Sequence, residues 1–134
     1  VHYWEVSIDR YSNHTADEAF GVARYDVAKE HILGKDAKAY AMYIDSQRSW
    51  FMHNGKHTNR VESANGGIQQ GSVIGVLLDL NQGSISFFVN DELQGGAPAF
   101  TNLPKGVVYY PAFSINKDVH ITLTSGLEPH SDSD

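Results

Sequence analysis

The sequence predicts an all-β domain, folded as an antiparallel sandwich of two sheets. About ten short segments have the composition of strands, and turn signals separate them at the roughly 8–12-residue spacing that is typical of sandwiches. One stretch, residues 25–36, is compatible with a turn of helix but is too short for more before Gly34. At 134 residues, the chain forms one domain that is long enough to bury a core.

The centre of the predicted core is a hairpin over residues 71–91. Residues 73–80 are apolar at nearly every position, which suits a strand that is covered on both faces. Asn81-Gln82-Gly83 then supplies a turn. In the strand that follows, Phe88 is the one exception to a clean alternation, and the apolar side chains on the core face are Ile85, Phe87 and Val89.

The N-terminal half contains five further predicted strands. Trp4, Val6 and Ile8 alternate with polar residues in the first, so they face the core. Gly21 within the second indicates a bulge or a close approach of another backbone. Asn54-Gly55 is a strong hairpin signal because both residues suit a positive φ. The five expected strands span residues 3–8, 19–24, 39–44, 48–53 and 56–62.

Three strands are expected beyond the central hairpin, at residues 92–97, 107–113 and 119–124. Pro111 restricts the second of these to a sheet edge or an interrupted strand, since proline cannot donate to a ladder. The alternation in the last strand predicts that Val119, Ile121 and Leu123 point inward.

Composition excludes several classes of function. The net charge of −6 argues against nucleic-acid binding, which requires a cationic surface. No segment approaches the roughly 18 apolar residues of a membrane span, so no membrane insertion is expected. Cysteine is absent, so this chain has no disulfide framework and no thiolate zinc site, which fits a reducing compartment.

The residues do not assemble a recognisable catalytic or metal site. His53 and His57 are four residues apart, but Asn54-Gly55 between them favours a turn rather than a shared helix face. There is no GxSxG nucleophile motif. A glycosidase needs two carboxylates across a cleft, and Glu5 and Asp79 each lack a partner on their own strand.

The aromatic residues divide into two groups. Trp4, Phe20, Phe87 and Phe113 are in phase with the apolar face of their strands, which predicts core packing. Tyr11 and Tyr25 instead lie in polar stretches beside Arg10 and Arg24, a combination that is enriched at binding hot spots. Trp50 fits either the core or an exposed site, because Phe51 is next to it and only one of the two is expected to point inward.

Five motifs occur in order: YWEV, AFGVAR, FMHNGK, IGVLLDLNQGSISFFVND and YPAFS, starting at residues 3, 19, 51, 74 and 110. Together they resemble the SPRY domain over residues 3–126. The long central motif is the most specific of the five. The stretch at residues 49–60, SWFMHNGKHTNR, and the AFGVAR form are most similar to the neuronal subgroup of tripartite-motif (TRIM) E3 ubiquitin ligases. In that subgroup a RING finger, B-boxes, a coiled coil, a COS box and a fibronectin type III domain precede the SPRY domain.

The resemblance implies a bent, concanavalin-like jelly-roll sandwich over residues 1–127, with residues 128–134 as a disordered polar tail. It also implies no catalytic machinery, and a protein or peptide ligand bound by loops at one end. No PRY-like segment precedes YWEV in this chain, so one sheet is expected to lack an edge strand. By position, the partner-binding candidates are Arg10, Tyr11, Asn13 and His14 after YWEV, Arg24 and Tyr25 at the end of AFGVAR, and Asn116, Lys117 and Asp118 after YPAFS.

Further expectations concern the longer protein that the resemblance implies. The domain itself needs no cofactor, and zinc is expected only in the RING and B-box domains. Dimerisation through the coiled coil and a cytoplasmic location, with the cytoskeleton as a site of association, follow from the same resemblance. The alternative is a carbohydrate-binding, lectin-like module, for which the loops at residues 13–14 and 116–118 offer an Asn-containing but thin candidate site.

Overall fold

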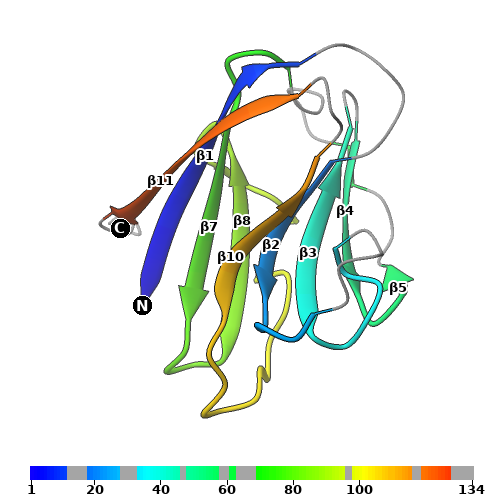
Figure 1. Cartoon of the computed structure of the whole chain (residues 1–134), viewed down its shortest axis with the longest axis vertical. Coiled ribbons are helices and arrows are strands. Elements are labelled where there is room, and N and C mark those ends of the chain that lie inside the picture. Colours follow the sequence, from blue (N-terminus) through cyan, green and yellow to red (C-terminus); the bar gives the residue numbers. More distant parts are fainter. Residues whose placement is uncertain are drawn as a thin grey trace.

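The computed structural model describes residues 1–11, 18–27, 33–45, 48–57, 61–62, 69–95, 98–115 and 119–127. These residues form two antiparallel sheets that face each other (Figure 1). The five-stranded first sheet has the order β11-β1-β7-β8-β9. Its strands are β1 (His2–Arg10), β7 (Val73–Asp79), β8 (Ser84–Val89), β9 (Glu92–Leu93) and β11 (His120–Leu127). The predicted all-β sandwich is confirmed.

The six-stranded second sheet has the order β10-β2-β3-β4-β5, and β6 pairs with β4 beside this path. Its strands are β2 (Glu18–Ala23), β3 (Ala39–Ile44), β4 (Arg48–His53), β5 (Lys56–His57), β6 (Val61–Glu62) and β10 (Tyr110–Ser114). The predicted Asn54-Gly55 turn joins β4 to β5, with φ values of 52° and 76°. Gly21 is confirmed as a site of close approach, because a Cβ atom there would meet the backbone of Tyr40 on β3.

The central hairpin lies at the predicted position and in the predicted phase. Ile74 pairs with Val89 and Asp79 with Ser84, so β7 and β8 are in register along their whole length. Asp79 closes the turn, since its Oδ1 accepts hydrogen bonds from the backbone N–H groups of Asn81 (3.0 Å) and Gln82 (3.1 Å).

The main core fills the space between the two sheets. Phe51 on β4 stacks with Phe87 on β8, with 5.8 Å between ring centroids, and so joins the two sheets directly. Burial of such side chains stabilises the fold by about 1.5–3 kcal/mol each. The first sheet and the segment before β10 contribute Trp4, Val6, Ile8, Ile74, Val76, Leu78, Ile85, Phe87, Val89 and Leu103, and the second contributes Phe20, Val22, Tyr40, Met42, Ile44 and Phe51.

A second apolar cluster covers the outer face of the second sheet. Trp50 is 6% exposed there and packs 5.8 Å from the ring of Tyr43. Leu33, from the connection between β2 and β3, is buried in the same cluster. Trp50 and Phe51 are therefore both buried, on opposite faces of β4. This answers the question that the sequence left open for Trp50.

The structure corrects the bounds of two predicted strands in the C-terminal half and shows that an inward-pointing residue can remain exposed. Strand β9 is limited to Glu92–Leu93 among the described residues, and β10 begins at Tyr110, leaving residues 107–109 irregular. Pro111 does lie in an edge strand, as predicted. Leu123 pairs with the buried Val6 and shares its face, yet it is 40% exposed. The reason is that β11 is itself an edge strand, so the second sheet does not cover this position.

Candidate functional site

The structure does not bring the described candidate residues together at one end. Arg10 ends β1, whereas Arg24 and Tyr25 follow the far end of β2. Figure 1 shows the end of β1 and the start of β2 at the top of the view, and the end of β2 at the bottom. A six-residue strand spans about 20 Å. The expectation of a single loop surface is therefore wrong for these residues.

The candidates near the end of β1 have mixed exposure. Arg10 is exposed, while Tyr11 is half-buried and packs against the main core. Asn13, His14, Asn116, Lys117 and Asp118 lie outside the described residues. At the opposite end, Arg24 and Tyr25 both belong to the described segment 18–27.

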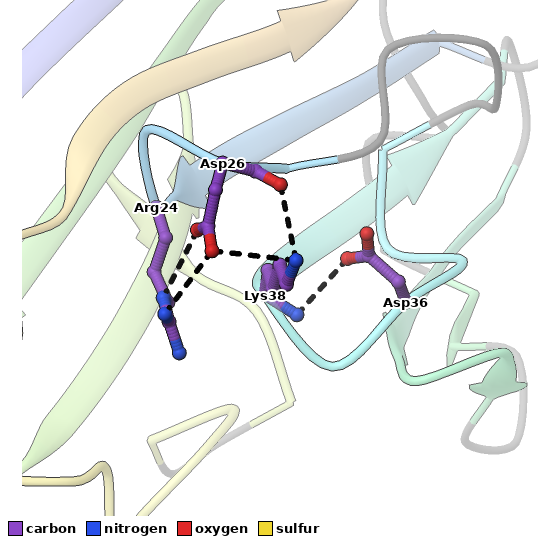
Figure 2. Close-up of polar contacts among 4 residues, drawn as sticks. All are labelled: Arg24, Asp26, Asp36 and Lys38. Carbon is purple, nitrogen blue, oxygen red and sulfur yellow. Dashed lines mark hydrogen bonds and ion pairs between the residues drawn. The ribbon is translucent and has the colours of Figure 1, made fainter.

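Tyr25 lies in a turn between charged residues. Figure 2 shows the hydrogen bonds and ion pairs that join the charged side chains of this turn. The Asp26 carboxylate lies 3.2 Å from the Arg24 Nε and 3.3 Å from the Lys38 Nζ, and so pairs with both cations. Arg24 also donates an Nη2–H to Asp26 Oδ2 at 3.2 Å. Lys38 donates from Nζ to the backbone oxygen of Asp26 (3.2 Å), and its backbone N–H donates to Asp36 Oδ1 (2.9 Å). We call residues Arg24, Tyr25, Asp26, Asp36 and Lys38 the charged corner.

Backbone hydrogen bonds fix the same corner to the second sheet. The Arg24 N–H donates to the Lys38 carbonyl (2.9 Å), and the Val27 N–H donates to the Arg24 carbonyl (3.2 Å). Tyr25 lies at the tip of this turn and is 80% exposed. The corner therefore presents one aromatic side chain to solvent on a backbone that is held on both sides.

The electrostatics of the corner follow from this arrangement. Desolvation raises the pKa of Asp26, but the Lys38 hydrogen bond, a backbone hydrogen bond and the positive charges of Arg24 and Lys38 outweigh it. The pKa of Asp26 consequently lies below its usual value, so the carboxylate is charged at neutral pH.

A stacked aromatic cluster supports the corner from the interior. Tyr40 stacks on His53 with 3.8 Å between centroids and 3° between ring planes, and Phe100 packs edge-on against Tyr40 at 5.1 Å. The His53 Nδ1 lies 2.8 Å from the Ala39 carbonyl. Tyr109 packs at 6.0 Å from Tyr40. Burial and the neighbouring Tyr40 raise the pKa of Tyr109, while the positive charge of Arg24 opposes the shift.

A groove of about 510 Å³ opens beside Tyr109, between β1, the end of β7 and the start of β10. A neighbouring hollow of about 400 Å³ shares Leu80, Val107 and Val108 with it and extends over Lys105. Sequence reasoning missed this site, because residues 107–113 were predicted to be an edge or interrupted strand, and no groove follows from that pattern alone. Pro111 was the signal for an interrupted strand, since proline has no N–H to donate to a ladder. Strand β10 begins only at Tyr110, and residues 107–109 before it are irregular.

Among the residues that the structure describes, no three His, Asp or Glu side chains are grouped so that they could hold a metal ion. The described part of the chain likewise contains no helix of the length and apolarity needed to cross a membrane. What the end of the sandwich does offer is an exposed tyrosine, a braced set of charges and an apolar groove.

Comparison with known proteins places this arrangement in a family. The chain is 55% identical over 128 residues to E3 ubiquitin-protein ligase TRIM9 of Drosophila melanogaster, a match that covers 96% of this chain and 16% of that protein. The crystal structure of the TRIM65 PSpry domain superposes with a TM-score of 0.67 at 23% identity, covering 91% of this chain and 62% of that one. This chain therefore spans less than two thirds of either relative.

The model of the SPRY domain family matches residues 1–128, which is nearly the whole chain. The match extends over both sheets, the charged corner and the groove. The chain belongs to the SPRY domain family.

Proposed function

We propose that this domain is a non-catalytic protein-interaction module that recognises the partner or substrate of a tripartite-motif E3 ubiquitin ligase. The observation that carries the proposal is the 80% exposure of Tyr25 on a turn that ion pairs and backbone hydrogen bonds hold in place. Tyrosine is enriched at protein-binding hot spots because it combines a large contact area with a polar hydroxyl.

The rigidity of the corner supports this role. Ordering a flexible loop on binding costs free energy, and a turn that is already held avoids most of that cost. Arg24 is about two-fifths exposed and is paired with Asp26, so its part is to hold the turn as well as to present charge. Tyr110, which is 53% exposed, pairs through its backbone with Ala23 and extends the exposed aromatic surface next to Arg24.

The proposed ligase context rests on the relatives. TRIM9, with 55% identity to this chain, is named as an E3 ubiquitin-protein ligase. Ubiquitin transfer would then belong to a RING domain elsewhere in a longer protein, with zinc bound there and in the B-boxes, and dimerisation would belong to a coiled coil. A cytoplasmic location fits the cysteine-free composition of this chain, and the proposed cytoskeletal association rests on the family resemblance alone.

The first test is quantitative affinity capture with the isolated domain as bait. We expect Tyr25→Ala to reduce the capture of specific partners at least about tenfold, in the range of hot-spot truncations. The matched control is Leu93→Ala, because Leu93 is also exposed but lies on β9, at the opposite edge of the first sheet from β11. Partners that are retained equally by wild type, Tyr25→Ala and Leu93→Ala would contradict the assignment of the corner.

The second test addresses the ligase. In a longer protein that contains the RING domain and this domain, Tyr25→Ala should reduce ubiquitination of the captured partner while self-ubiquitination of the ligase continues. That combination separates recognition from catalysis. Equal loss of both activities would instead indicate a catalytic or folding defect and would contradict the proposed role.

A further inference from the structure

Most of the large exposed apolar side chains among the described residues lie on or beside the edge strands β10 and β11 and the strands next to them. Eight large hydrophobic residues among those described are at least 37% exposed, and only Leu93 lies away from β10, β11 and their neighbours. Contiguous exposed apolar surface on a soluble domain marks an interaction site. The other seven, which we call the open seam, are Val1, Tyr25, Val108, Tyr110, Phe113, Ile115 and Leu123.

Two residues of the open seam face the interior of the sandwich and are still exposed. Phe113 on β10 pairs with Phe20, which is completely buried, and Leu123 on β11 pairs with Val6, which is 1% exposed. Directly paired residues share a face of their sheet, so Phe113 and Leu123 point toward the opposite sheet. They remain 39% and 40% exposed, which means that neither edge strand is covered there by the sheet it faces.

The groove lies between the two edge strands, since Pro111 of β10 and Ser125 of β11 both line it. Strand β10 ends the second sheet, so among the described strands its outer edge is unpaired. A strand that pairs with this edge of β10 would lie about 4.8 Å from it. Its alternate side chains would then enter the groove that Trp4, Leu78, Val108 and Tyr109 line.

Pro111 sets a limit on this mode of binding. It lies in the middle of β10 and has no N–H, so a paired peptide finds one donor missing. An incomplete ladder leaves affinity and selectivity to the side chains that enter the groove. We therefore expect the ligand to carry apolar residues at alternate positions. An extended segment without this pattern is not expected to bind.

The positive charge of Lys105, in the hollow beside the groove, adds a second requirement for the ligand. None of the residues that line the groove or the hollow beside it is acidic, although the whole chain carries a net charge of −6. Lys105 is exposed in the hollow and makes no ion pair with a described residue. Asp79 is close in sequence to this lining, but its Oδ1 already accepts two backbone hydrogen bonds. The local charge complements an acidic side chain on the ligand.

We propose that the open seam binds an extended segment of a partner protein, paired with β10, with apolar side chains at alternate positions and an acidic residue beside Lys105. This inference rests on the proposed function, since it defines the chemistry of a partner for the same domain. Addition of a peptide strand to an exposed sheet edge is an established mode of recognition in proteins.

The experiment selects ligands from a phage-displayed library of random linear peptides on the isolated domain. Enriched peptides should show apolar residues at positions i and i+2 with Asp or Glu nearby. In fluorescence polarisation with the synthesised consensus peptide, Val108→Asp should weaken binding at least about tenfold, because it places a charge on the apolar wall. Leu93→Asp is the matched control and should leave the affinity unchanged.

Lys105→Glu provides a second variant at an exposed site that folding does not depend on. This variant should lower the affinity for the acidic peptide several-fold. It should leave unchanged the affinity for a matched peptide in which Asn or Gln replaces the Asp or Glu. Absence of any enrichment over a Val108→Asp bait would overturn the proposal, as would a consensus that lacks apolar alternation.

Two further outcomes identify a different occupant and also overturn the proposal. Sedimentation of the wild-type domain as a dimer that Val108→Asp dissociates would show that a second copy covers the seam. Loss of peptide binding in a longer protein that contains this domain would show that another part of that protein occupies it. If Tyr25→Ala abolishes partner capture while no seam peptide is found, the proposed function stands and only the seam fails.

Discussion

The ring of Tyr3 lies across the backbone of Gly75 on the neighbouring strand, on the outer face of the first sheet. Its hydroxyl is 2.5 Å from the position that a Cβ atom of residue 75 would take. The same hydroxyl donates to Glu5 Oε2 at 2.9 Å, and Phe88 packs edge-on at 6.3 Å, so Tyr3 is 4% exposed although it faces away from the core. The absence of a side chain at position 75 is what lets this ring lie flat against the sheet.

Gly75→Ala should therefore destabilise the domain. The added methyl group displaces the Tyr3 ring, and overpacking of this kind costs about 1–3 kcal/mol. Chemical denaturation measures the change in the free energy of unfolding. In a Tyr3→Ala background the same substitution should cost much less, and an undiminished cost there would show that Tyr3 is not the obstacle.

Gly21→Ala should cost more than Gly75→Ala. A Cβ atom at position 21 meets the Tyr40 carbonyl and the Ala41 Cα, which is 2.8 Å away, and these backbone atoms of β3 belong to a hydrogen-bonded sheet. A side chain can rotate away, but paired backbone cannot move without breaking the ladder. Equal unfolding free energies for the two variants would contradict this difference.

Trp50→Ala should lower the free energy of unfolding by about 3–5 kcal/mol, the range for deletion of a large buried aromatic side chain. The reason is that Trp50 is enclosed by the second apolar cluster rather than by solvent. Urea denaturation followed by circular dichroism gives the value. Tyr25→Ala serves as the exposed comparison and should change stability by less than about 0.5 kcal/mol.

Asp26→Asn should remove an acid-sensitive part of the stability of the charged corner. Because the pKa of Asp26 is lower in the folded protein, its contribution is present above the unfolded value of about 3.9 and is lost as the pH falls through the folded value. Wild type and variant should therefore differ in stability near neutral pH and converge in acid. Denaturation curves measured across that range check the sign, and a difference that grows in acid would contradict it.

Tyr3→Phe should make the domain less sensitive to alkali. Burial, followed by the hydrogen bond and negative charge of Glu5, raises the pKa of Tyr3 far above its usual value. The stability linked to the protonated phenol is present below the unfolded pKa of about 10 and declines as the pH rises above it. Wild type should lose stability in that range faster than the variant. Unfolding midpoints measured on either side of about pH 10 test this.

Local patterns in the sequence were enough to orient most side chains. The alternation in residues 84–89 placed Ile85, Phe87 and Val89 in the core, and the structure confirms it. Asn54-Gly55 was identified from the positive φ values that only a few residue types adopt readily, and Gly21 from the rarity of glycine within a strand. These predictions succeed because they depend on φ preferences and on a period of two, both of which are local.

The position of the candidate site was predicted less well. Arg10 and Tyr11 lead into the connection that precedes β2. Arg24 and Tyr25 follow the last residue of β2, at the opposite end of that strand. Chain order alone implies this separation, because the loop that follows one strand is the loop that precedes the next. The expectation of one shared surface came from the family resemblance and overlooked that constraint.

By itself, the sequence determined that this chain is an all-β sandwich of the SPRY family, which of its strand faces are apolar and where its tightest turns lie. Only the tertiary structure decided which apolar faces are covered. Trp50 is buried in a cluster that includes Leu33, a residue from a different segment of the chain, while Leu123 is 40% exposed because no described strand of the opposite sheet covers it. The period of a strand sets the direction of a side chain, but its burial depends on what the rest of the chain places in front of it.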